Sequence, residues 1–215
     1  MSRKIKKIKQ QKKHILIALE DTKSSRFYIK DLLKDKGIIP HIVFAKHIGT
    51  DPKSVLQAIE QFNKANPTIK YEKAWLVIDK DSFNKNNFKG TLETARQKGI
   101  CVAYSNECYE LWLLLHFKDI TSFKTREMLK KELNHEFQKN FNLKYEKSEK
   151  HVYGMLIDRQ EIAIQRAKKL IKNIIKIDGK LDPYNNNPST KIYLLIECLN
   201  NLENCKGNNY LDCNV

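Results

Sequence analysis

The chain of 215 residues carries 40 Lys and Arg against 25 Asp and Glu, a formal net charge of +15. Its hydrophobic content of 41% excludes disorder throughout, and 7 Gly with 5 Pro exclude a collagen-like or low-complexity chain. The length suits one domain, or one domain with an appended lobe, because domains typically contain about 100–200 residues. The positive charge favours a polyanionic partner such as nucleic acid, although a solubilising basic tail would produce the same excess.

Residues 1–13 form a basic tail that contains seven Lys or Arg and no acid. The apolar run that follows, at residues 15–19, is too short for the hydrophobic region of a signal peptide, and Glu20 interrupts it. No apolar run approaches the roughly 20 residues that a membrane span needs. We therefore expect a cytoplasmic protein with no membrane partner.

Strand and helix patterns alternate over the first 120 residues, which predicts a mostly parallel sheet flanked by helices. Apolar runs of strand length occupy residues 14–19, 41–45, 74–78 and 100–104. Helical patterns occupy residues 25–36, a segment that begins at Pro52 with Asp51 as its cap, residues 87–98 (ended by Gly99) and residues 107–117.

The second half of the chain is predicted to be helical. Helical patterns occupy residues 124–134, 155–175 and 189–202, separated by polar connectors at 135–154 and 178–188. We therefore divide the chain into the basic tail 1–13, an α/β catalytic domain at 14–120, a helical extension at 121–205 and a second tail at 206–215.

The cysteines are odd in number and form no C-x-x-C pair, which argues against a disulfide framework or a zinc site. This pattern predicts reduced, partly buried thiols. The five residues are Cys101, Cys108, Cys198, Cys205 and Cys213.

Acidic residues follow three of the four predicted strands. Glu20 comes directly after the first strand, Asp79 and Asp81 follow the third, and Glu110 lies just beyond the fourth. The carboxyl ends of parallel strands form the ligand-binding edge of such a sheet, so we expect these carboxylates to converge there. In an extended backbone Asp79 and Asp81 point to the same side, about 6.5–7 Å apart at Cα. Two carboxylates that close favour a cation beside them, and Mg²⁺ accepts such ligands together with phosphate.

Other residues near this edge have both functional and structural interpretations. Lys23, Ser105 and Asn106 are close enough in sequence to contact a substrate, although Lys23 is equally compatible with a solvated surface lysine. An Asp after a strand commonly caps a helix or occupies a turn, and Glu110 would otherwise pair with a nearby Lys. His116, in an apolar helix, is interpreted as a structural histidine.

A Glu after the first strand and a D-x-D after the third resemble the pattern of the Toprim domain found in topoisomerases, bacterial primases and OLD-family nucleases. The segment at 104–117, YSNECYELWLLLHF, resembles the signature of RloB-like proteins, usually SNPCFELWLLLHF. VIDKDSF at 77–83, Asp51-Pro52 with Lys46 before it, and NPST at 187–190 fit the same family. The resemblance extends from about residue 15 to residue 202.

The chain departs from the family pattern in its loops. The first strand is usually followed by E-G-E-K-T-E, whereas residues 20–25 are EDTKSS. The usual Gly-rich stretch after the second strand is KHIGT at 46–50, and the Pro of SNPC is Glu107. The four acids are retained, but loop glycines that would let the backbone approach a phosphate closely are missing.

The resemblance implies a Toprim-like Rossmannoid sheet with a C-terminal helical extension and a Mg²⁺-dependent nuclease site, Mn²⁺ being an alternative. Glu20, Asp79 and Asp81 would hold the metal, and Glu110 would be a further catalytic residue. Family members are associated with phage-defence loci, often beside an AAA ATPase. We therefore expect an antiviral nuclease that cuts RNA, such as tRNA, or DNA, with an ATPase partner; a homo-oligomer is compatible with the sequence.

Two other functions remain open from the sequence. The chain would alternatively be a non-cleaving regulatory subunit of an ATPase complex that binds a nucleotide or nucleic acid. It would otherwise be a basic nucleic-acid-binding protein without enzymatic activity. The chain has no Walker A motif, so we expect no ATPase activity of its own.

Overall fold

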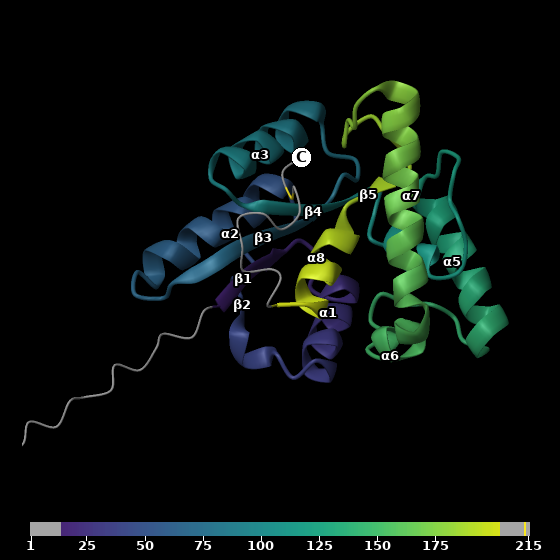
Figure 1. Cartoon of the computed structure of the whole chain (residues 1–215), viewed down its shortest axis with the longest axis horizontal. Coiled ribbons are helices and arrows are strands. Elements are labelled where there is room, and N and C mark those ends of the chain that lie inside the picture. Colours follow the sequence, from purple (N-terminus) through teal and green to yellow (C-terminus); the bar gives the residue numbers. More distant parts are fainter. Residues whose placement is uncertain (1–13, 203–212, 214–215) are drawn as a thin grey trace, which may run out of the picture.

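A single five-stranded sheet forms the centre of the computed structural model, which describes residues 14–202 and residue 213 (Figure 1). The predicted tails lie outside the described residues, apart from Cys213. The strand order is β2-β1-β3-β4-β5, and all neighbouring pairs are parallel except β4 with β5. The strands are β1 (His14–Leu19), β2 (Ile42–Phe44), β3 (Tyr71–Asp79), β4 (Cys101–Asn106) and β5 (Ser189–Thr190).

Helices cover both faces of this sheet, as two-sided burial of a parallel sheet requires. One face packs against α2 (Pro52–Ala65) and α3 (Lys85–Gln97), and the other against α1 (Ser24–Asp35), α4 (Glu110–Leu115) and α8 (Ile192–Asn200). The other helices of the predicted extension lie beyond the second face (Figure 1). They are α5 (Arg126–Phe141), α6 (Val152–Leu156) and α7 (Gln160–Asp178). Two short 3₁₀ turns are η1 (Ile39–His41) and η2 (Ile157–Arg159). The predicted α/β fold with C-terminal helices is confirmed.

Cap residues fix where several helices begin. The Asp51 side chain accepts a hydrogen bond from the Ser54 amide at 3.1 Å, which starts α2 as predicted. Asn84 accepts from the Asn87 amide at 2.9 Å, so α3 begins two residues earlier than expected. Gly99, which follows α3, has a φ of +65°, a backbone conformation that favours glycine.

The extension differs from the sequence prediction in three places. The helix expected at 124–134 begins at Arg126 and continues to Phe141, because Phe137 extends its buried face into the predicted connector. The helix expected at 155–175 is interrupted by η2. The helix expected from residue 189 begins at Ile192, because Ser189 and Thr190 pair with Asn106 and Ser105 as the strand β5.

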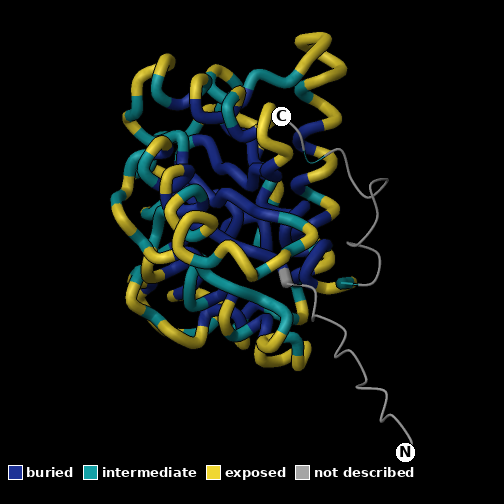
Figure 2. The backbone as a smooth tube through the Cα atoms, turned by 90° about the vertical axis from the view of Figure 1, so that its left-hand side faces the viewer, coloured by how far each residue is buried: buried dark blue, intermediate teal, exposed yellow. Residues whose placement is uncertain are grey.

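The hydrophobic core has one layer on each side of the sheet, and its central strands and the helix α4 are buried (Figure 2). A polar chain crosses the layer beneath α1. The His116 ring donates through Nδ1 to the Trp112 carbonyl at 3.0 Å and accepts the Tyr28 hydroxyl through Nε2 at 3.2 Å. The Gln160 amide donates to the Tyr28 hydroxyl at 2.9 Å. Burial lowers the pKa of His116 to about 4, so the ring is neutral and structural near neutral pH.

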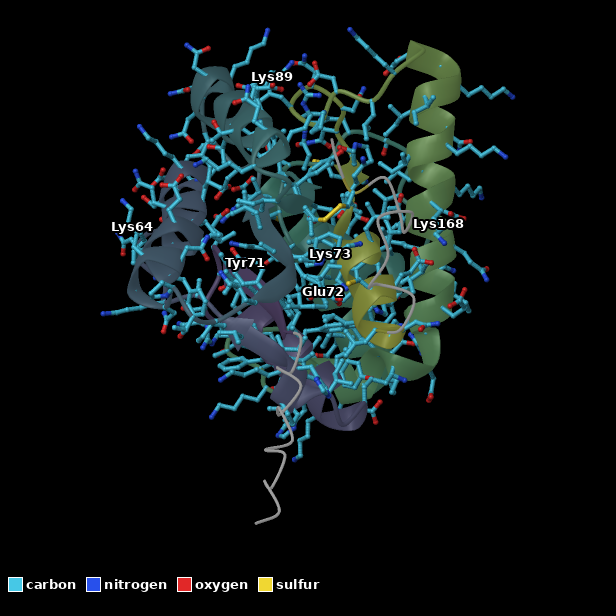
Figure 3. All side chains as sticks on the ribbon, turned by 60° about the vertical axis from the view of Figure 1, so that its left-hand side comes forward. Lys64, Tyr71, Glu72, Lys73, Lys89 and Lys168 are labelled. Carbon is cyan, nitrogen blue, oxygen red and sulfur yellow. A yellow bond between two sulfur atoms is a disulfide. The ribbon has the colours of Figure 1, made fainter. Side chains whose placement is uncertain are left out.

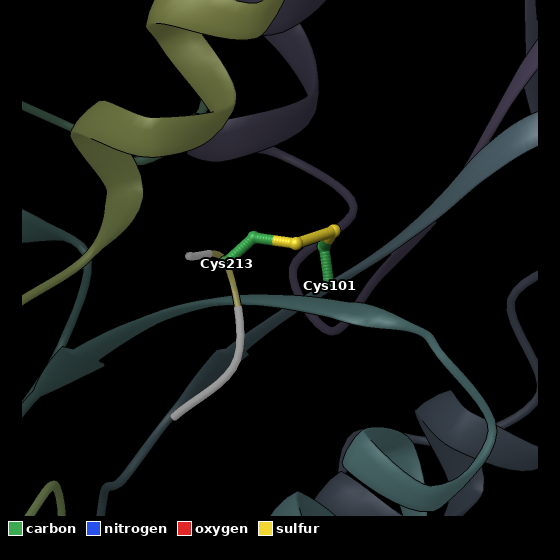
Figure 4. The surroundings of a disulfide bond; sticks show 2 residues. All are labelled: Cys101 and Cys213. Atoms are coloured by element: carbon green, nitrogen blue, oxygen red, sulfur yellow. A yellow bond between two sulfur atoms is a disulfide. The ribbon is translucent and has the colours of Figure 1, made fainter. Parts of the chain in front are cut away.

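A disulfide joins Cys101, at the start of β4, to Cys213 (Figure 4). The expectation that the cysteines are reduced thiols is therefore wrong for these two and also for Cys198, which is disulfide-bonded, whereas it holds for the buried Cys108. The Cys213 carbonyl accepts a hydrogen bond from the Val102 amide at 3.4 Å, so Cys213 lies beside β4. The two cysteines are 112 residues apart, and their spacing in the sequence gives no sign that they meet.

The surface carries many basic side chains, of which Figure 3 labels Lys64 on α2, Lys89 on α3 and Lys168 on α7. Lys89 pairs with Asp182 at 2.7 Å and Lys168 with Glu197 at 2.5 Å. Exposed pairs of this kind contribute about 0–1 kcal/mol each. Across residues 14–202, no helix is long and apolar enough to cross a membrane.

Candidate functional site

The ends of β1 and β3 bring the first two predicted acids into contact. Glu20 directly follows β1, and its Oε2 accepts a hydrogen bond from the backbone amide of Asp79 at 2.7 Å. Asp79 is the last residue of β3 and is 7% exposed. Asp81 lies two residues later, in the turn that follows β3, with a φ of +46°. Its amide donates to the Glu107 carbonyl at 3.0 Å. The carboxyl edge of the sheet therefore holds these three acids together.

Glu110 supplies a fourth carboxylate from the first turn of α4. Its side chain is fully buried. Its oxygens have no ordinary hydrogen-bond partner among the described residues; the weak thiol donor Cys108 lies beside it, and the Lys147 ammonium is 3.6 Å from Oε1. Burial, together with the charges of Glu110 and Asp79, raises the pKa of the Cys108 thiol, so this cysteine stays protonated.

Two cations from the helical extension complete the site, and the sequence analysis did not single them out. Arg126, the first residue of α5, bonds Asp81 Oδ2 through Nη2, and the same nitrogen is 3.9 Å from Asp79 Oδ2. Its backbone amide donates to Glu107 Oε2 at 2.8 Å. Lys147 follows α5 in the loop before α6. Nothing in the sequence distinguishes these two from the other basic residues, since 40 are present.

The environment shifts the pKa values of the buried acids strongly. Burial, with the nearby charge of Asp81, raises the pKa of Glu20 to about 8 against the opposing effects of the Asp79 amide, Arg126 and Lys147. Burial, with the charges of Glu20 and Glu110, raises the pKa of Asp79 well above its ordinary range. Both acids are therefore expected to bind a proton readily when no other cation is present.

Unfolding of the metal-free protein should depend on pH in a direction set by Glu20. Its folded-state pKa of about 8 lies above the ordinary 4.5, so the folded state keeps a proton that the unfolded state has released. The stabilisation that this proton provides is complete below the unfolded-state pKa of 4.5 and is lost as pH rises through the folded-state pKa of about 8. We expect the melting temperature in EDTA to fall over that window, and less steeply in Glu20→Gln.

The pH series has a matched control in Glu161→Gln, because Glu161 lies exposed on α7. This control should follow the wild-type slope. If Glu20→Gln also follows the wild-type slope, Glu20 does not carry a raised pKa in the folded protein.

The three predicted substrate-binding residues lie in different surroundings. Lys23 is exposed at the start of α1, close in sequence to Glu20, with its side chain toward solvent. Ser105 is fully buried, and its hydroxyl bonds the Thr190 hydroxyl at 2.9 Å. Asn106 is 1% exposed, and its amide donates to the carbonyls of residues 183 and 184 at 3.1 and 3.0 Å. In this structure Ser105 and Asn106 therefore attach the last strand and its loop to β4.

The NPST segment also serves this attachment. Asn187 accepts from the Lys124 amide at 3.0 Å and donates to the Lys124 carbonyl at 2.9 Å. Lys124 lies two residues before Arg126, the first residue of α5. These two hydrogen bonds with Asn187 therefore fix the segment that carries Arg126. His47, in the loop after β2, bonds the Glu20 carbonyl at 3.0 Å and positions the other side of the site.

The carboxylate oxygens of this site are suitable ligands for a divalent cation, although the four side chains are not arranged around a single point. Within the described part of the chain, no three His, Cys, Asp or Glu side chains gather closely enough to hold a metal ion. Arg126 instead bonds Asp81. Glu110, however, is a fully buried carboxylate whose oxygens receive no N–H or neutral O–H hydrogen bond from any described residue. Oxygen ligands with unsatisfied negative charge are those that Mg²⁺ and Mn²⁺ accept.

These features define an α/β protein with a mostly parallel sheet and a cluster of four carboxylates at its carboxyl edge. The family model of RloB-like proteins matches residues 15–199. The chain therefore belongs to the RloB-like protein family, and the resemblance noted from residues 104–117 is confirmed. No curated protein and no solved structure matches the chain.

Proposed function

We propose that this protein is a metal-dependent nuclease that hydrolyses phosphodiester bonds in RNA, such as tRNA, or in DNA. The observation that carries the proposal is the convergence of Glu20, Asp79, Asp81 and Glu110 at one edge of the sheet. Such an arrangement is the one expected of a Toprim-type site, and the positive charge of the chain suits a nucleic-acid partner.

The roles we propose follow from burial. Asp79, Asp81 and Glu20 would hold a divalent cation, which when bound polarises the phosphoryl oxygen and stabilises the leaving oxygen. Alternatively, Glu20 would move a proton and leave the metal to the two Asp residues, because burial raises its pKa to about 8 in the metal-free protein. Glu110 adds negative charge beneath Asp79 and orients the site without reaching solvent. Exposed Lys23 would contact the nucleic-acid backbone.

We further propose that the protein acts as the effector of an antiviral defence system in the cytoplasm, with an AAA ATPase partner. This part of the proposal rests on family membership. The chain itself would supply the nuclease site, and the ATPase would control it. A homo-oligomer would be compatible with this arrangement.

The test is a cleavage assay on purified full-length protein. The substrates are bulk tRNA, single-stranded RNA and plasmid DNA, each with Mg²⁺, Mn²⁺ or EDTA. Cleavage that requires metal would support the proposal and would identify the substrate class. Absence of cleavage on all three, both alone and after co-expression with the ATPase, would contradict it.

One observation favours a second function, a non-cleaving subunit of an ATPase complex. Arg126 and Lys147 already provide counter-charges for Asp81 and Glu110, so a metal ion is not needed to balance these acids. A subunit of this kind would bind nucleic acid or nucleotide equally well in EDTA. Metal-dependent cleavage would exclude it.

A further inference from the structure

Two cationic side chains from the helical extension contact the carboxylates of the sheet. We propose that Arg126 and Lys147 form the phosphate-binding half of the site, and that they exchange their carboxylate partners for substrate phosphate when a divalent cation is bound. This inference rests on the proposed nuclease function and identifies the residues that would contact the substrate backbone.

Arg126 is incompletely bonded where it stands. Its Nη2 bonds Asp81 and lies 3.9 Å from Asp79, but its buried Nε has no acceptor among the described residues. A guanidinium offers five N–H donors in a planar fork, which matches two phosphate oxygens. Its side chain is 25% exposed, so part of it reaches solvent although Nε is buried. We therefore infer that the Nε–H group of Arg126 donates to an acceptor supplied by the substrate.

Lys147 is the cation next to Glu110, as Arg126 is the cation next to Asp81. Its Nζ lies 3.6 Å from Glu110 Oε1, beyond an ordinary hydrogen-bond distance, and its side chain is 33% exposed. The backbone beneath it is held in place, because the Ser24 hydroxyl donates to the Lys147 carbonyl at 3.4 Å and bonds the Tyr145 hydroxyl at 2.9 Å. The ammonium can therefore turn from Glu110 to solvent while its backbone stays fixed.

The same carboxylates cannot serve both kinds of cation fully. Asp81 oxygens engaged by the Arg126 guanidinium are less available to a metal ion. Among the described residues, no three His, Cys, Asp or Glu side chains gather into a metal site while Arg126 bonds Asp81. Removal of Arg126 should accordingly strengthen metal binding, whereas binding would weaken if the contact with Arg126 were needed to hold the carboxylates in place.

The first measurement is calorimetric titration of Mn²⁺ into the full-length protein. We expect Arg126→Gln to bind Mn²⁺ about 3–30-fold more tightly than wild type, because it removes a competing charge near the carboxylates. Arg96→Gln is the matched control, since Arg96 pairs with Glu93 on the exposed surface of α3. An unchanged or weakened Mn²⁺ affinity in Arg126→Gln would overturn the inference.

The second measurement is the affinity for a short fluorescein-labelled oligouridine, in EDTA and with Ca²⁺ to slow cleavage. We expect the wild type to bind the oligouridine more tightly with Ca²⁺ than in EDTA. In Arg126→Gln and Lys147→Gln this increase in affinity should be about tenfold smaller. Arg126→Lys keeps the charge without the fork, and provides a well-folded test if the Gln variant unfolds. It should recover only part of the gain, and equal metal-dependent gains in wild type and all variants would overturn the inference.

These readouts separate the inference from the proposed function. If wild type cleaves substrate and Arg126→Gln cleaves it equally well, the inference fails while the nuclease proposal stands. The wild type could also fail to cleave any substrate while the Mn²⁺ and oligouridine affinities change as expected. In that case the nuclease proposal fails and the exchange of partners stands.

Discussion

Replacement of Asp79 by Asn should reduce metal-dependent cleavage about a thousandfold or more. Asp79 ends β3 and is 7% exposed; its backbone amide bonds Glu20, and the charges of Glu20 and Glu110 act on its carboxylate. The amide keeps the shape but removes the negative charge that a divalent cation requires. A thousandfold loss corresponds to about 4 kcal/mol of transition-state stabilisation, which is within the range that a catalytic metal supplies.

The loss should be measured as initial cleavage rate, with Asp119→Asn as the matched control. Asp119 is an exposed acid paired with Lys169 at 3.4 Å, so its replacement should leave the rate unchanged. Wild-type cleavage by Asp79→Asn would show that the active centre lies elsewhere or that a contaminating nuclease is present.

Replacement of Glu110 by Met should stabilise the metal-free protein and abolish cleavage. A fully buried carboxylate without an N–H partner is costly, and an apolar side chain of similar volume removes that cost. Substitutions of this kind at buried ion pairs are often neutral or stabilising, by up to about 1–4 kcal/mol. Lys147 would turn to solvent. We expect a melting temperature in EDTA that is several degrees higher, at about 2–4 °C per kcal/mol.

Glu161→Met, on the exposed surface of α7, is the control for a change from acid to apolar residue without burial. It should alter neither melting temperature nor cleavage by much. A Glu110→Met protein that melts at a lower temperature would show that Glu110 stabilises the fold, and that its carboxylate is not retained for function at the expense of stability.

The sheet was predictable because each parallel strand is a continuous apolar run, and because an acid directly follows β1 and ends β3. The strand β5 was not, since two polar residues have no periodicity and are recognised only through their pairing with β4. The full length of α5 was likewise hidden, because its buried positions 133 and 137 lie in a polar stretch of sequence.

Two of the predicted substrate-binding residues have structural contacts that the sequence did not indicate. Ser105 and Asn106 stand next to the acids in sequence, yet both are buried and bond to residues about 80 positions away. A buried hydrogen-bond network and a substrate-binding loop require the same residue types, so sequence alone does not separate them. Arg126 and Lys147 show the converse case, because only the packing of the extension brings them to the carboxylates.

The late position of β5 in the chain has a consequence for synthesis on the ribosome. The strands that carry Glu20 and Asp79 emerge first, but β4 gains its outer neighbour only when Ser189 and Thr190 have been made. A product that terminates early therefore lacks the segment that anchors Ser105 and Asn106 and clasps Lys124 before Arg126. For a protein proposed to cut nucleic acid in the cell that makes it, activity would thus be confined to chains that are nearly complete.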